Sequence, residues 1–108
     1  MKIAIPLFGS RVSPRFGCES EILIVDIEER KEINRREFSA MGLGIPQRIS
    51  LLSSLGVDTL ICGGIDIFCL RSLSARGLQI IPGVIGEVDE ALKYFLSGEL
   101  REGQCVSY

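Results

Sequence analysis

Histidine is the most informative absence from this sequence of 108 residues. Histidine is the commonest general base, the usual partner of serine and cysteine nucleophiles, and the commonest nitrogen ligand of metals. Its absence excludes sites that are built around imidazole. The sequence also lacks the G-x-x-x-x-G-K-[ST] motif, which argues against a phosphate-binding NTPase.

No C-x-x-C motif occurs among the four cysteines, which are Cys18, Cys62, Cys69 and Cys105. This spacing argues against zinc ribbons and thioredoxin-like redox motifs. No apolar run approaches the ~18 residues that are needed to cross a bilayer. Residues 1–6 are typical of a strand and not of a signal peptide. We therefore expect a cytoplasmic protein with reduced thiols and no membrane partner.

A surplus of basic residues is also absent, since the net charge is −2 and the pI is near 5.1. The basic residues Arg35 and Arg36 are interleaved with acids, as on a solvated face. We therefore expect no nucleic-acid partner. The length of 108 residues and the 46% hydrophobic content predict one domain with one core.

The pattern of apolar residues predicts the element order β-β-β-α-β-α-β-α. Pro46 at the start of a helix, Asp66 as the cap of the next one, and glycines after the helices mark the boundaries. Residues 28–31 predict a charged turn, and residues 101–108 predict a loose tail that follows a domain of residues 1–100. The expected strands are residues 2–7, 21–27, 32–38, 57–62 and 78–81, and the expected helices are residues 46–55, 67–76 and 87–97.

We expect a single three-layer α/β domain, in which a right-handed crossover places the strand at residues 57–62 beside the first strand. Its mixed five-stranded sheet has the order 3-2-1-4-5, with strand 2 antiparallel to the others. The carboxyl ends of strands 1 and 4 then form a switch point, where ligands of open α/β sheets bind. Two loops meet there, namely residues 8–18 and residues 62–66.

The two loops carry residues that suit an anion. The Gly63-Gly64 pair permits close backbone approach before a helix amino end, and Arg11 and Arg15 supply positive charge. Ser10 and Ser13 add hydroxyl donors. Solvated loop residues and an ordinary tight turn are the structural alternatives.

Five segments of the chain resemble the dinitrogenase iron–molybdenum cofactor biosynthesis family, which includes nitrogenase accessory proteins. They are V-S-P-x-F-G at 12–17, I-V-D at 24–26, G-V-D-x-x-I-C-G-G-I at 56–65, V-D-E-A-L at 88–92 and L-S-G-E-L at 96–100. The resemblance implies a ribonuclease H-like fold and non-catalytic binding of an anionic iron–sulfur or iron–molybdenum-type cluster. It also implies a partner protein in cofactor biosynthesis.

Cysteine is the expected metal ligand in this interpretation. Cys62, at the end of a strand, is a candidate thiolate ligand of iron with a pKa lowered by the following helix. Cys18 is the second candidate. The structural alternative for Cys62 is a small buried hydrophobic residue, and packing is favoured for Cys69. Cys105 is expected to be an incidental surface thiol.

One position departs from the family. Members often carry histidine before the Phe-Gly of the first loop, and this chain has Arg15 there. Either cysteine alone provides the ligation, or the protein binds something else, or it binds no metal. A module for a small anionic metabolite and a protein-interaction domain without a ligand are therefore the alternative functions.

Catalysis is not expected. A ribonuclease H-type nuclease needs clustered carboxylates on its central strands, but residues 2–7 contain no acid. Asp26 and Asp58 fall at strand ends that lie away from the switch point. The oligomeric state is left open between a monomer and a homodimer, because the strand at residues 32–38 is an exposed edge.

Overall fold

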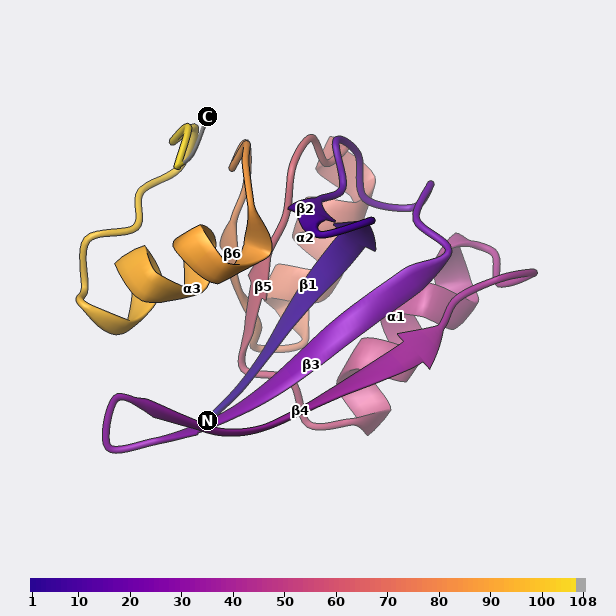
Figure 1. Ribbon diagram of the computed structural model, residues 1–108. Coiled ribbons are helices and arrows are strands. Elements are labelled where there is room, and N and C mark those ends of the chain that lie inside the picture. The colour runs from indigo at the N-terminus through magenta and orange to yellow at the C-terminus, as the bar shows by residue number, and fades with distance from the viewer. Residues whose placement is uncertain (107–108) are drawn as a thin grey trace.

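The computed structural model describes residues 1–106 as a compact α/β domain with a mixed sheet (Figure 1). Each of the eight predicted strands and helices is present, with bounds shifted by one or two residues. The strands are β1 (Lys2–Phe8), β2 (Arg11–Val12), β3 (Glu21–Glu28), β4 (Lys31–Ser39), β5 (Thr59–Ile61) and β6 (Gln79–Ile81), and the helices are α1 (Ile45–Ser54), α2 (Ile67–Ala75) and α3 (Val88–Leu96).

The sheet follows the path β4-β3-β1-β5-β6. β3 is antiparallel to β1 and to β4, whereas β1, β5 and β6 are parallel to one another. The predicted neighbour order is therefore present, but the sheet has six strands and not five. The extra strand, β2, pairs with the end of β1 after a reversal at Gly9, whose φ of 62° suits glycine. Two residues are too few to show an alternating pattern.

Helices cover both faces of the sheet, as Figure 1 shows. On β1, Ile3 and Ile5 pack in the core beneath α3, and Ala4 packs in the core beneath α1 and α2. β3 divides its side chains in the same way. This two-sided burial explains why both strands have nearly continuous apolar sequences.

Local chemistry sets the ends of α2. The Asp66 carboxylate accepts a hydrogen bond of 2.8 Å from the Cys69 backbone N–H, so the predicted cap is present. None of the helices described within residues 1–106 has the length and apolar character required to span a membrane.

The prediction of a loose tail is wrong for residues 101–106. Val106 is 7% exposed in the core beneath α3, and its backbone N–H bonds to the Ile85 carbonyl at 2.8 Å. The Ile85 N–H in turn bonds to the Gln104 carbonyl at 2.9 Å. One apolar side chain and a short parallel bridge therefore attach this segment. Residues 107–108, which belonged to the same prediction, lie outside the described residues.

Candidate functional site

The two loops singled out from the sequence lie against each other at the carboxyl end of β1 and β5. The Gly64 N–H donates to the Pro14 carbonyl, and the Phe16 N–H donates to the Gly64 carbonyl, both at 2.7 Å. These bonds form an isolated parallel bridge between Arg15 and Gly64. The loops thus close on each other instead of leaving an open crevice between them.

The glycine pair serves this closure. A Cβ atom on Gly63 would lie 2.4 Å from the Ser13 carbonyl oxygen and 2.5 Å from that of Pro14. Contacts this short with backbone atoms do not occur, so only glycine fits. The Gly64 N–H, which the sequence suggested for an anion, is already bonded to Pro14. The close approach predicted for Gly63-Gly64 is therefore made by the protein's own chain.

The bridged segment separates two hollows. The Cys18 hollow, of about 500 Å³, is lined by residues that include Ser13, Arg15 and Cys18. The glycine hollow, of about 390 Å³, is lined by residues that include Arg11, Gly63 and Gly64. The expected anion site is thus divided in two.

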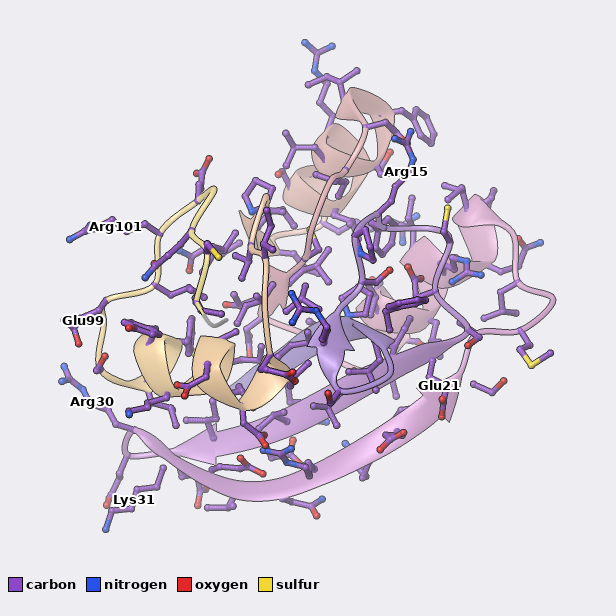
Figure 2. The ribbon with its side chains drawn as sticks, turned by 45° about the horizontal axis from the view of Figure 1, so that its top comes forward. Arg15, Glu21, Arg30, Lys31, Glu99 and Arg101 are labelled. Carbon is purple, nitrogen blue, oxygen red and sulfur yellow. The ribbon has the colours of Figure 1, made fainter. Side chains whose placement is uncertain are left out.

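Arg15 and Cys18 are two of the exposed polar residues that line the Cys18 hollow. The Arg15 carbonyl accepts hydrogen bonds from the Ser13 hydroxyl, at 3.3 Å, and from the Cys18 N–H, at 3.4 Å. Figure 2 shows Arg15 at the rim of the molecule beside the amino end of α2. The Cys69 N–H, with a smaller contribution from the Arg15 charge, lowers the pKa of Asp66 at that end.

Ser10 and Arg11 belong to a different set of contacts. The Ser10 hydroxyl donates to a Glu87 carboxylate oxygen at 2.7 Å, and an Arg11 guanidinium nitrogen lies 3.8 Å from the other oxygen. The Val88 N–H donates to the Ser10 carbonyl at 2.9 Å. These contacts attach the β1–β2 turn to the amino end of α3.

Cys62 is fully buried and packs in the core beneath α1 and α2. Burial, followed by the Glu19 charge, raises the pKa of its thiol to about 12. This is the reverse of the predicted lowering, because the helix end that follows is capped by Asp66 and the side chain points into the core. Cys62 is not among the described residues that line either hollow.

The remaining cysteines follow their predicted environments. Cys69 is buried, and its thiol lies 3.4 Å from an Asp66 carboxylate oxygen. Burial, together with Asp66, raises the pKa of Cys69 to about 11. Cys105 is exposed. Within residues 1–106, no three histidine, cysteine, aspartate or glutamate side chains are grouped so that they could hold a metal ion.

Sequence reasoning missed a buried ion pair beneath the Cys18 hollow. Arg48 of α1 is 6% exposed and Glu19 is 3% exposed, and their charged groups are in direct contact. A signal was available, since Arg48 falls on the same helical face as Ile49 and Leu52, which are buried. A charged residue on the apolar face of a helix indicates a buried partner of opposite charge.

Nearly the whole chain is similar to a known protein family and to known proteins. A family model described as "Dinitrogenase iron-molybdenum cofactor" matches residues 1–98. The uncharacterized protein MJ0580 of Methanocaldococcus jannaschii is 32% identical over an alignment of 108 positions, and the alignment covers 94% of this chain and 91% of that protein.

Two solved structures share the fold. The crystal structure of PH0822 superposes with a TM-score of 0.88 at 23% identity, with 94% of each chain covered. The NMR structure of a Thermotoga protein, provisionally identified as NifB, gives a TM-score of 0.75 at 30% identity. That superposition covers 96% of this chain and 95% of the Thermotoga chain.

Proposed function

The chain belongs to the dinitrogenase iron-molybdenum cofactor family, and we propose that it is a non-catalytic protein that binds an anionic iron–sulfur-type metallocluster as cargo. The fold would be of the ribonuclease H-like class that the resemblance implies. The carrier role implies partner proteins in cofactor biosynthesis that supply and receive the cluster. We place this role in the cytoplasm, where thiols remain reduced.

One observation carries the proposal, namely that Arg15 and Cys18 are both exposed and line the same hollow. A guanidinium group neutralises anions and donates several hydrogen bonds from a rigid plane. A cysteine thiolate is a soft ligand that suits iron and molybdenum–sulfur chemistry. Together they can hold a sulfide-rich anion at the protein surface.

The cysteines that are available as metal ligands restrict the kind of cluster that the protein can bind. Cys62 and Cys69 are buried with raised pKa values, so they remain neutral thiols away from the hollow. A cluster that needs four cysteine ligands from one site does not fit these residues. A cluster that brings its own sulfide ligands, and is held by charge and one thiolate, does fit. In this proposal Cys62 is a packing residue.

The carboxylates of the Cys18 hollow also suit binding better than catalysis. Glu19 is engaged with Arg48 and with the Gly17 N–H, which leaves Glu21 as the exposed carboxylate among the lining residues. Acid–base chemistry on a substrate usually uses a positioned pair of titratable groups.

The test is anaerobic reconstitution with iron and sulfide, with and without molybdate, followed by visible absorption and metal analysis per chain. We expect the unchanged protein to bind metal with charge-transfer absorbance, and we expect Cys18→Ser and Arg15→Gln to weaken binding by roughly tenfold or more each. Cys105→Ser is the matched control, because Cys105 is also exposed but lies outside the hollow. A colourless, metal-free protein would contradict the proposal. Equal losses in Cys105→Ser would also contradict it.

A further inference from the structure

Arg48 does not line the Cys18 hollow, but it contacts Glu19, which does, and two residues of the connector that follows β4. Its guanidinium donates to the Leu43 carbonyl at 3.0 Å and to the Ala40 carbonyl at 3.1 Å. It also donates to the Glu19 carbonyl at 2.8 Å. One side chain on α1 thus attaches the end of the Cys18 loop to the connector that follows β4.

Glu19 extends these contacts to the other side of Cys18. One of its carboxylate oxygens pairs with Arg48, and the other accepts the Gly17 N–H at 2.7 Å. The backbone is therefore held at Gly17, directly before Cys18, and at Glu19, directly after it. Cys18 itself is exposed between these two fixed points.

Packing alone does not account for this pair. The side chains of Arg48 and Glu19 are 7% and 0% exposed, and removing two charges from water carries a large desolvation cost. Apolar residues of similar volume often give equal or greater stability at such positions. Apolar residues, however, make no directional bonds to the three carbonyl groups or to the Gly17 N–H.

We propose that Arg48 is the positioning residue of the cargo site, acting through Glu19 to hold Cys18 beside Arg15. This inference rests on the proposed function for its purpose, since the cargo is what the placed thiol would contact. The positioning itself concerns only the backbone on either side of Cys18.

The experiment compares the unchanged protein with Arg48→Lys and with the double variant Glu19→Met/Arg48→Met. In the double variant no buried charge is left without a partner, so the fold should be retained. Amide hydrogen exchange at Gly17 is the primary measurement, and the core amide of Leu52 is the reference for a change in stability alone. Glu19→Met removes the acceptor of the Gly17 N–H directly, so Arg48→Lys, which keeps Glu19, isolates the contribution of Arg48. We expect exchange at Gly17 to rise by about tenfold or more relative to Leu52 in the double variant.

Arg48→Lys separates charge from geometry, because an ammonium group lacks the planar fork that reaches several carbonyls. In Arg48→Lys we expect the Gly17 amide to keep only part of its protection from exchange. Metal binding after reconstitution should fall by about tenfold in the double variant and less in Arg48→Lys. Arg36→Met is the matched control, since Arg36 is exposed and pairs with Asp26, at 3.7 Å, on the outer strands.

The outcomes distinguish this inference from the proposed function. Unchanged exchange at Gly17 in the double variant would overturn the inference. Full protection of the Gly17 amide in Arg48→Lys would overturn it as well. Metal binding that persists unchanged, despite faster exchange at Gly17, would also overturn it. If the unchanged protein binds no metal, the proposed function fails, and exchange at Gly17 in Arg48→Lys, which keeps the Glu19 acceptor, still decides whether Arg48 positions the loop.

Discussion

Cys62 and Gly63 are adjacent in the chain and have different physical roles. Cys62 ends in the core, where its thiol is dry and neutral, and Gly63 lies in the loop contact, where a side chain has no room. Both residues were candidates for ligand binding on the basis of their place after a strand. The surroundings of each residue instead predict an effect on stability.

The raised pKa of Cys62 predicts a loss of stability at alkaline pH. An unfolded cysteine ionises near pH 8.5, whereas the folded thiol keeps its proton until about pH 12. The folded state therefore binds more protons above pH 8.5, so the free energy of unfolding falls as pH rises, by about 1.4 kcal/mol per unit for one such group. Cys62→Ala should remove this contribution to the slope in urea titrations under reducing conditions at pH 8–10.5, and the contribution of Cys69, whose pKa is also raised, should remain. An unchanged slope would show that the thiol ionises normally in the folded protein.

Gly63→Ala should destabilise the fold by about 2–3 kcal/mol, because the new methyl group meets two backbone carbonyl oxygens that cannot move independently. Gly64→Ala is the matched comparison, since its Cβ would lie 3.3 Å from the Pro14 carbonyl oxygen. The smaller overlap should give a clearly smaller loss in the same urea titration. Equal losses in the two variants would contradict the role given to Gly63.

At the scale of elements, the β3–β4 hairpin carries backbone strain in its turn. Glu29 and Arg30 have φ angles of 50° and 64°, which is the left-handed region for both central residues. Such turns favour Asn-Gly, and other residues there cost about 1–2 kcal/mol each. The sequence predicted a charged turn at residues 28–31 but not this conformation.

Glu29→Asn combined with Arg30→Gly should therefore raise the free energy of unfolding by about 1–2 kcal/mol. Chemical denaturation at neutral pH measures the change. Glu28→Asn is the control, because Glu28 lies in β3 outside the positive-φ pair and should give no gain. A hairpin variant without any increase would indicate that the turn residues carry no strain.

At the scale of the whole molecule, the order of the sheet leaves β4 as an edge strand. All of its residues except Phe38 are exposed, and they include five charged side chains. The β3–β4 register also shifts between Asp26 and Ile27. Charged side chains and bulges on edge strands hinder pairing between molecules.

We therefore expect the protein to be a monomer at concentrations of about 100 µM, as measured by light scattering after size-exclusion chromatography. Replacing Arg35 and Glu37 by valine should allow association through the edge, because these changes remove two of the charges that hinder pairing. A dimer of the unchanged protein that Ile33→Lys dissociates would contradict this expectation.

The candidate site shows where sequence reasoning stopped. The meeting of the two loops followed from strand order, because the carboxyl ends of neighbouring parallel strands lie at one edge. The division into two hollows did not follow, since it depends on two hydrogen bonds between Pro14, Phe16 and Gly64. The attachment of Ser10 and Arg11 to Glu87 joins residues that are more than 70 positions apart. No local pattern encodes such a pairing.

The sequence by itself determined the family, the element order, the neighbours in the main path of the sheet and the cap at Asp66. The family followed from the resemblance of five sequence segments. The other properties depend on periodicity, on local hydrogen bonding and on short crossovers, all of which act within one or two elements. Tertiary structure decided that Cys18 is exposed while Cys62 is buried, which glycine is needed for packing, and that Arg48 and Glu19 pair beside the Cys18 hollow. Burial, pKa and long-range pairing depend on what the completed fold places around each group, and those neighbours come from distant parts of the chain.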